Sequence, residues 1–372
     1  MNDHPLTISA PGRICLFGEH LDYLGLSVIT AAINLRISIR GKKRQDRIFH
    51  IDLPDIGGQE IIDLTQPIQY VIERDYLRSS INVLLRQQVD FSTGYDCVVR
   101  GEIPINSGTS SSSALVVAWI KFLLTIAGDS RAHDPLAIAR LAHQAEVLEF
   151  GEPGGMMDHF ASSFGSILYI DFGRPGGHQQ PLPAQVGKFV LGDSLEPKDT
   201  KGILARVKGG ILDAMSKLSR QNRNVTIKTL TLAELEEYKK FISTEQFKLC
   251  SAAVTNRDIT ERAKRIFEQD PIDDDALGRL LNLQQAELRD RLRISTPKID
   301  RMIDAALAAG ALGAKINGSG GGGCMFAYAP DHYQQVAAAI ARAGGKPYII
   351  EVAQGASMDA DENNLGSAPF DN

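Results

Sequence analysis

A cluster of polar and charged side chains follows an apolar, strand-like segment near the start of the chain. Residues 11–23 read PGRICLFGEHLDY, and the side chains in them that could do chemistry are Arg13, Glu19, His20, Asp22 and Tyr23. Carboxylates and an imidazole accept or donate hydrogen bonds in fixed directions, so together they can hold several sugar hydroxyls. A strand end followed by a solvated, charged turn explains the same segment equally well.

A second segment, rich in serine, runs directly into an apolar stretch. Residues 104–114 read PINSGTSSSSA, and apolar residues then dominate up to Ile126. Small residues let the backbone approach a ligand closely, and the unpaired N–H groups at a helix start favour phosphates. A serine at this place can also bind Mg²⁺. Capped serine-rich loops are common, but four consecutive serines ahead of an apolar helix favour phosphate binding.

A third segment, KINGSGGGGC at residues 315–324, contains the pattern G-x-G-x-x-G at 318–323. In a dinucleotide-binding fold this pattern opens a helix. Here the strand-like residues CMFAYA (324–329) follow instead, so we exclude a Rossmann fold. Because the loop lies between two apolar stretches, we expect it to close over a ligand rather than to be a flexible connection.

Two carboxylates between the second and third segments are candidates for a base or a metal ligand. Glu146 lies on a predicted amphipathic helix, and Asp158 lies in the glycine-bordered sequence GGMMDH. Such acids often have functional roles, although each one alone is more often a surface acid or a helix cap. The chain has no G-x-x-x-x-G-K-[ST], H-E-x-x-H or G-x-S-x-G motif, and its D-F-G at 171–173 lacks the other protein-kinase motifs.

The elements that must position these residues are mixed. Alternation, β-branched residues and helical spacing predict strands at 6–10, 26–39 with a short break, 48–63, 94–103, 165–172, 188–191, 312–329 with a central loop, and 347–352. Helices are predicted at 73–88, 112–126, 135–150 (capped by Asp134) and 332–343, with several more across 202–310. Residues 173–187 are predicted to be a long loop or a domain boundary. This arrangement favours an α+β fold.

Composition limits the class of protein. The chain has 372 residues, which suggests two domains or one large one, and its net charge of -5 excludes a nucleic-acid binder that relies on bulk charge. Its four cysteines form no C-x-x-C pair, so we expect neither a zinc site nor disulfides. We therefore expect the protein to work in a reducing compartment. We find no signal peptide and no membrane span, and therefore expect a cytoplasmic protein without a membrane partner.

Taken in order, the three segments resemble those of the GHMP kinases, the family of galactokinase, homoserine kinase, mevalonate kinase and phosphomevalonate kinase. The resemblance spans residues 8–329. GRICLFGEHLDY looks like the galactokinase signature G-R-V-N-L-I-G-E-H-T-D-Y, and GGMMDHFAS resembles the G-I-M-D-Q segment of that branch. The resemblance implies a ribosomal-S5-like N-terminal lobe (1–185), a ferredoxin-like C-terminal lobe (186–353) and an active site in the cleft between them. We expect residues 354–372 to form a disordered acidic tail.

The resemblance also implies roles for individual residues. Asp158 matches the base that takes the proton from the anomeric hydroxyl of a sugar, and Arg13 matches the arginine that keeps this aspartate ionised. Glu146 precedes Asp158 by twelve positions, as expected of the galactokinase branch. The other matches are to Mg²⁺ ligands (Ser112, Glu146), ATP-phosphate contacts (Gly108, Ser110, Ser111, Ser112), sugar contacts (Glu19, His20, Asp22, Gly155) and the third-motif loop (Gly318, Ser319, Gly320, Gly321). The implied reaction is transfer of the γ-phosphate of ATP, with Mg²⁺, to the C1 hydroxyl of a hexose or related sugar.

The chain departs from the galactokinase pattern at several positions. Cys15, Leu21, Thr109, Ser113 and His159 replace asparagine, threonine, leucine, alanine and glutamine, and residues 193–200 lack the tyrosine that contacts the sugar. Another acceptor, such as a uronic acid, a heptose phosphate or an isoprenoid alcohol, is therefore an alternative. The carboxylates of Glu19 and Asp22 favour a neutral polyol, because they repel an anion. A silent sugar sensor is a further alternative, against which the intact Arg13, Ser112, Glu146 and Asp158 argue.

Overall fold

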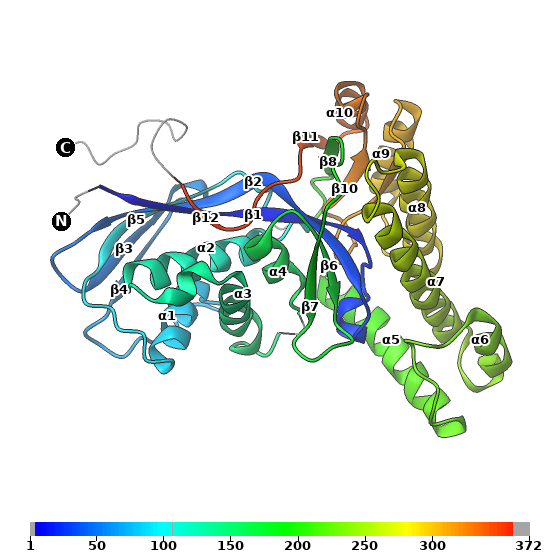
Figure 1. Cartoon of the computed structure of the whole chain (residues 1–372), viewed down its shortest axis with the longest axis horizontal. Coiled ribbons are helices and arrows are strands. Elements are labelled where there is room, and N and C mark those ends of the chain that lie inside the picture. The colour runs from blue at the N-terminus through cyan, green and yellow to red at the C-terminus, as the bar shows by residue number, and fades with distance from the viewer. Residues whose placement is uncertain (1–3, 106, 153, 199, 360–372) are drawn as a thin grey trace.

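The computed structural model describes residues 4–359 except 106, 153 and 199, and its chain forms two lobes (Figure 1). The first lobe contains an eight-stranded sheet in the order β12-β1-β2-β5-β3-β4, with β6 paired to β2 and β7 paired to β6. These strands are β1 (Leu6–Phe17), β2 (Val28–Lys43), β3 (Ile48–Leu53), β4 (Gly58–Asp63), β5 (Tyr95–Gly101), β6 (Ile167–Asp171), β7 (His178–Leu182) and β12 (Ser357–Met358).

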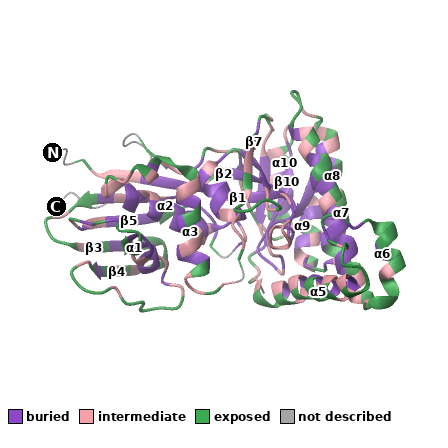
Figure 2. Cartoon of the chain, turned by 60° about the horizontal axis from the view of Figure 1, so that its bottom comes forward, coloured by how far each residue is buried: buried purple, intermediate pink, exposed green. Residues whose placement is uncertain are grey.

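Helices cover one face of this sheet (Figure 1). They are α1 (Tyr76–Arg86), α2 (Ser111–Ile126), α3 (Pro135–His143) and α4 (Met157–Phe164). The apolar helix α2 is the central one, and Figure 2 shows it as largely buried. Its Trp119 stacks on Phe122 with ring centroids 5.4 Å apart, and the Trp119 indole N–H donates to the Leu77 carbonyl at 3.0 Å. As predicted, Asp134 caps α3 by accepting from the Leu136 N–H.

The second lobe contains an antiparallel sheet in the order β11-β8-β10-β9. Its strands are β8 (Phe189–Asp193), β9 (Gly313–Ile316), β10 (Cys324–Tyr328) and β11 (Lys346–Ile350). Numbered within the lobe, the order is fourth, first, third, second, which is that of a ferredoxin-like βαββαβ unit. Two helices pack on this sheet, α9 (Pro297–Ala308) and α10 (Tyr333–Arg342). The predicted two-lobed α+β fold is therefore confirmed.

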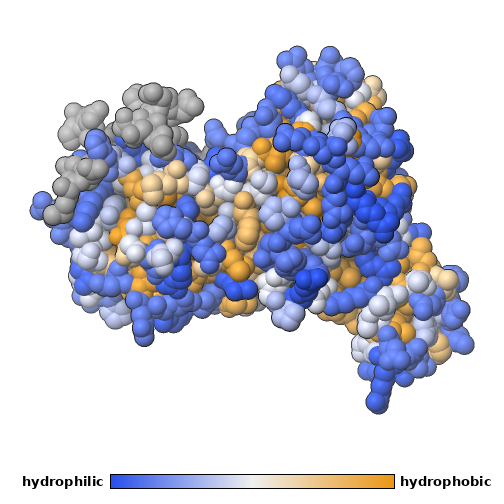
Figure 3. Space-filling view, viewed as in Figure 1, coloured by the Kyte–Doolittle hydropathy of each residue, from blue (hydrophilic) through white to orange (hydrophobic). Residues whose placement is uncertain are grey.

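Further helices extend the second lobe between β8 and α9. They are α5 (Thr200–Gln221), α6 (Leu232–Tyr238), α7 (Thr244–Phe267) and α8 (Asp274–Ala286). The end of α5 and the short α6 project from the body of the molecule with a mostly hydrophilic surface (Figures 1 and 3). None of the described helices is long and apolar enough to cross a membrane.

Strand β1 belongs to the cores of both lobes. Its C-terminal half places Ile14, Leu16 and Phe17 in one apolar cluster with residues of α7 and α8. The Phe17 and Phe267 rings meet edge to face with centroids 6.2 Å apart. Since apolar burial drives packing, this shared cluster fixes the second lobe against the strand that carries the first polar segment.

The structure corrects several expected elements. Residues 26–39 were expected to contain a break, but β2 runs without one as far as Lys43 because it pairs with β1, β5 and β6. The expected loop 173–187 contains β7, which pairs with β6. In place of the single helix expected over 135–150, the α-helix α3 ends at His143 and a π-helical turn, Gln144–Leu148, follows it.

The start of the expected tail is also ordered. Residues 354–359 return to the first lobe, where β12 pairs with β1. The Arg36 guanidinium holds this segment by donating to the carbonyls of Gln354 and Gly355 and to the Ser357 hydroxyl. The expectation of disorder is therefore wrong for 354–359, because β1 offers an unpaired edge there. The rest of the expected tail, 360–372, lies outside the described residues.

The burial of α2 generates a stability prediction. Replacing Leu123→Ala, on α2 and 0% exposed, removes contacts in a filled core and should lower the free energy of unfolding by about 2–5 kcal/mol. The matched control Leu85→Ala, on α1 and 43% exposed, should change it by about 0.5 kcal/mol or less. Urea unfolding followed by the fluorescence of Trp119 measures both variants. Equal effects would show that α2 is not the packing centre of the lobe.

Candidate active site

The three polar segments meet in a cleft of about 710 Å³. The cleft is lined by residues of all three segments and by both candidate carboxylates, Glu146 and Asp158. Strand β1 and the turn after it supply the first segment, the start of α2 the second, and the loop between β9 and β10 the third. Segments about 300 positions apart in the sequence thus converge on one cavity, as the sequence analysis predicted.

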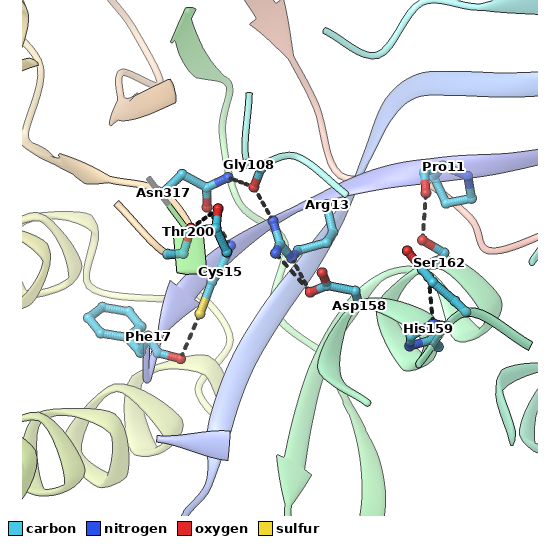
Figure 4. A network of polar contacts seen from close by, with 12 residues as sticks. Pro11, Arg13, Cys15, Phe17, Gly108, Asp158, His159, Ser162, Thr200 and Asn317 are labelled. Atoms are coloured by element: carbon cyan, nitrogen blue, oxygen red, sulfur yellow. Dashed lines mark hydrogen bonds and ion pairs between the residues drawn. The ribbon is translucent and has the colours of Figure 1, made fainter. Parts of the chain in front are cut away.

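An ion pair between Arg13 and Asp158 lies in this cleft (Figure 4). Both Nε and Nη2 of Arg13 lie 2.8 Å from Asp158 Oδ1. Strand β1 positions the arginine, and the first turn of α4 positions the aspartate. Burial alone would raise the pKa of Asp158, but the guanidinium beside it holds that pKa below its ordinary value. The aspartate is therefore ionised at neutral pH.

Gly108 joins the three segments through its carbonyl. Arg13 Nη1 donates to this oxygen, and Asn317 Nδ2 donates to it at 2.8 Å (Figure 4). Asn317 in turn accepts from the Cys15 N–H at 2.9 Å. Gly108 has φ 90°, and a Cβ on it would lie 2.9 Å from the Asn317 carbonyl oxygen. Only glycine fits this place, since an L side chain is strained at that φ and would collide with the third segment.

The serine-rich segment forms the start of α2. Ser110 takes a left-handed conformation with φ 62°, and the helix begins at Ser111. The first backbone N–H groups of a helix have no intrahelical partner, and Ser110, Ser111 and Ser112 at this helix start line the cleft. Such a helix start can bind phosphate oxygens through its N–H groups and its dipole.

Glu146 lies beside this helix start and is held by His159. The Glu146 Oε2 and His159 Nε2 atoms are 2.7 Å apart, and both side chains are buried. Burial raises the pKa of Glu146, but His159 together with the Ser112 and Ser113 hydroxyls lowers it below its ordinary value. In the sequence, His159 stands out only as a departure from the galactokinase pattern. A histidine one position after a candidate base could have suggested a partner for the second carboxylate.

The donor set here fits Mg²⁺. The Ser112 hydroxyl and the Glu146 carboxylate supply hard oxygen ligands, and a magnesium ion usually completes its shell with phosphate oxygens and waters. No group of three or more His, Cys, Asp or Glu side chains that could hold a metal unaided occurs in the described part of the chain. A metal bound here would therefore complete its shell with waters or with the phosphate oxygens of a nucleotide.

Glu19 has a partner that the sequence analysis did not foresee. Its Oε1 is bound by Lys315 Nζ of β9, and the two side chains are 1% and 0% exposed. Lys315 also donates to the Cys15 carbonyl at 2.9 Å. Glu19 lines the cleft, but its charge is neutralised by a lysine of the other lobe. The predicted repulsion of an anionic acceptor by this carboxylate is therefore lost.

His20 and Asp22 line the cleft close to the ion pair. Burial, helped by nearby cations, lowers the pKa of His20 to about 4, so its ring is neutral. The ring accepts from the Tyr23 hydroxyl at Nδ1 (2.7 Å) and donates from Nε2 to the Ser319 carbonyl (3.1 Å). Burial, with Asp158 nearby, raises the pKa of Asp22 to about 6. A Cβ on Gly155 would lie 2.0 Å from Asp22 Oδ2, so Gly155 makes room for this carboxylate.

The glycines of the third-motif loop lie in two different environments. Gly318 and Ser319 line the cleft. Gly320 and Gly321 instead lie against Ile294 of the second lobe, where the Gly321 N–H donates to the Ile294 carbonyl at 2.7 Å. The predicted closure of this loop over a ligand therefore concerns only its first half.

Sequence reasoning missed other residues of the cleft. They are Arg74, Tyr76, Glu152, Lys198, Thr200 and Lys201. Arg74 and Glu152 form an ion pair with an N–O distance of 2.7 Å. Lys198 and Lys201 flank the start of α5, and two lysines beside a predicted helix start were a signal that the sequence did contain.

Comparison with known proteins agrees with this geometry. Family models described as "GHMP kinases N terminal domain", "GHMP kinases C terminal" and "Galactokinase galactose-binding signature" match residues 75–166, 265–346 and 1–43. The mevalonate kinase of Pyrococcus furiosus is 30% identical over 93% of this chain and 96% of its own. The galactokinase of Actinobacillus succinogenes is 29% identical over 87% of this chain and 85% of its own.

Solved structures of the same fold include two from these groups. Lactococcus lactis galactokinase complexed with galactose has a TM-score of 0.81 and 22% identity, with 95% of each chain covered. Methanococcus jannaschii mevalonate kinase has a TM-score of 0.73 and 20% identity, with 94% of this chain and 98% of that one covered. Since relatives at 30% identity cover nearly the whole chain and models of both domains match it, the chain belongs to the GHMP kinase family.

Proposed function

We propose that this protein is a sugar 1-kinase of the galactokinase type, which transfers the γ-phosphate of ATP to the anomeric C1 hydroxyl of a hexose or related sugar. The observation that carries the proposal is the Arg13–Asp158 ion pair, which lies at the junction of the serine-rich helix start and the turn with His20 and Asp22. The match of residues 1–43 to the galactose-binding signature supports a sugar as the acceptor.

Asp158 acts as the base in this proposal. Its carboxylate is ionised because Arg13 lies beside it, so it can accept the proton of an acceptor hydroxyl within hydrogen-bond reach. The acceptor oxygen then attacks the γ-phosphorus, and the bond to the β–γ bridging oxygen breaks to release ADP. Arg13 neutralises part of the charge that spreads over the phosphoryl oxygens.

The start of α2 holds the ATP phosphates. Backbone N–H groups of Gly108, Ser110 and Ser111 would donate to the phosphate oxygens, and the dipole of the helix would favour their charge. Ser112 and Glu146 would hold Mg²⁺, with His159 orienting the glutamate. When bound, Mg²⁺ neutralises charge on the β- and γ-phosphates.

Another acceptor is the second candidate. The curated relatives include mevalonate kinases, and the Glu19 charge that argued for a neutral polyol is paired with Lys315. Of the two carboxylates of the first segment, Asp22 is then the one left to oppose an anionic acceptor, and its raised pKa weakens this opposition near pH 6. A kinase for an acidic acceptor such as mevalonate or a uronic acid is consistent with this cleft.

An acceptor panel tests the proposed function. ADP release is measured with ATP and Mg²⁺ across free hexoses including galactose, uronic acids and mevalonate, and products are identified by phosphorus NMR. We expect steady turnover with a free sugar and a phosphate signal at the anomeric position. Turnover with only an acidic or isoprenoid acceptor would establish the second candidate instead. ATP and sugar binding without turnover would establish a sensor.

Removal of the base should abolish turnover without removing nucleotide binding. For Asp158→Asn we expect kcat to fall by about 100-fold or more, since the amide cannot accept the proton. Calorimetry should show ATP affinity close to that of the wild type. The control Asp304→Asn, exposed on α9, should keep wild-type kcat. Near-normal turnover of Asp158→Asn would assign the base elsewhere.

Acceptor binding should weaken in acid through Asp22. Its pKa of about 6 means that the carboxylate is mostly ionised at pH 7 and becomes protonated as the pH falls to 5. Because a protonated carboxyl accepts fewer hydrogen bonds from hydroxyls, the KM for a neutral sugar should rise by up to roughly tenfold per pH unit below that point. In Asp22→Asn this dependence should disappear. An acceptor KM that stays constant from pH 7 to 5 would contradict the role of Asp22.

A further inference from the structure

Lys198 reaches the centre of the cleft from the second lobe. It precedes α5, and its side chain passes between the serine-rich and the glycine-rich segments. A Cβ on Gly323 would lie 2.8 Å from Lys198 Cδ, and a Cβ on Gly108 would lie 3.1 Å from Lys198 Nζ. The absence of side chains at these two glycines therefore leaves the passage through which the lysine extends.

The backbone around Lys198 is held to the glycine loop. The Gly323 N–H donates to the Glu196 carbonyl at 3.1 Å, and the Ser194 N–H donates to the Gly323 carbonyl at 2.9 Å. These two bonds tie the segment after β8 to the start of β10. The position of the lysine is thus fixed by the same loop that borders the cleft.

The Lys198 ammonium has no protein partner among the described residues, although it lies in the field of Arg13 and Asp158. Three other cations of the region have protein partners, since Lys315 binds Glu19, Arg74 binds Glu152 and Arg206 donates to the Leu292 carbonyl. Burial, followed by repulsion from Arg13, lowers the pKa of Lys198 to about 8. An unpaired, partly buried ammonium is unfavourable unless an anion joins it.

The position of the Lys198 ammonium indicates which anion would pair with it. Nζ lies against Gly108, whose loop leads into the helix start at Ser111, and close to the ion pair of the proposed base. In the proposed function, the phosphoryl group passes between the start of α2 and Asp158 on its way from ATP to the acceptor oxygen. Its negative charge spreads over three equatorial oxygens in the transition state, and cations preorganised around it lower the barrier.

We propose that Lys198 is a second cationic catalytic residue, whose Nζ donates hydrogen bonds to the phosphoryl group in transit. This inference rests on the proposed phosphoryl transfer, but not on the acceptor being a sugar. In the step, the acceptor O–H proton goes to Asp158, the acceptor O–P bond forms and the bond from the γ-phosphorus to the bridging oxygen breaks. Lys198 remains protonated throughout and neither gives nor takes a proton.

Two variants and a control test the proposal in steady-state kinetics, with whichever acceptor the wild type phosphorylates. In Lys198→Met we expect kcat to fall by about 100-fold, with both KM values changed by less than about threefold. In Lys198→Arg, which keeps the charge, about tenfold of this loss should be recovered. The control Lys248→Met removes an exposed lysine of α7 and should keep wild-type kinetics. Melting temperatures of all variants check the fold.

The pH profile separates a catalytic from a structural role. Wild-type kcat/KM, which reports the free enzyme, should decline as the pH rises through about 8, because Lys198 loses its proton there. The groups that face it are Arg13 (β1), His20 (after β1), Asp158 (α4) and Cys324 (β10). The pKa of His20 is about 4, that of Cys324 about 12, and that of Asp158 below its ordinary value, so none of these three titrates near pH 8. In Lys198→Arg the alkaline decline should vanish, since arginine stays charged.

Three results would overturn the inference. An unchanged kcat in Lys198→Met, with the wild type active, would overturn it alone and leave the proposed function intact. An increase only in the acceptor KM would make Lys198 an acceptor-binding residue instead. Absence of phosphoryl transfer by the wild type to every acceptor would overturn the proposed function and this inference together.

Discussion

The ion pair between Arg13 and Asp158 is the interaction on which the arrangement of the cleft depends. A buried charge without its partner is strongly unfavourable, so β1 and α4 must hold these two side chains in register. Arg13 also binds the Gly108 carbonyl, which extends the constraint to the loop ahead of α2. One guanidinium thus links the strand, the helix that carries the carboxylate and the serine-rich start of α2.

Features set by neighbouring residues could be predicted from the sequence. The burial of α2 follows from its unbroken apolar composition, and the glycine loop was separated from a Rossmann motif because a strand, β10, follows it. The convergence of Arg13, Ser112 and Asp158 came from the family resemblance, since periodicity alone does not bring distant segments together. Short motifs therefore predict which residues line the cleft, but not how these residues are arranged in space.

Features set by contacts between distant residues could not be predicted. The Glu19–Lys315 pair joins residues 296 positions apart, and nothing near Glu19 in the sequence indicates a lysine partner. The family resemblance implies that Glu19 contacts a sugar. The pair with Lys315 shows that the same carboxylate also joins the two lobes and that its charge is neutralised. The lysines at the start of α5 are visible in the sequence, but the environment of Lys198 is not. Its meaning depends on the two glycines that make room for it, and these lie in two other segments.

The return of the chain to β1 has a mechanical consequence. The polypeptide crosses between the lobes once after β7 and again between β11 and β12, so the second lobe is tethered at two places rather than one. These two crossings add to the apolar cluster that β1 shares with α7 and α8 and to the buried Glu19–Lys315 pair. The second lobe is therefore anchored to the first by backbone, by apolar packing and by charge at once.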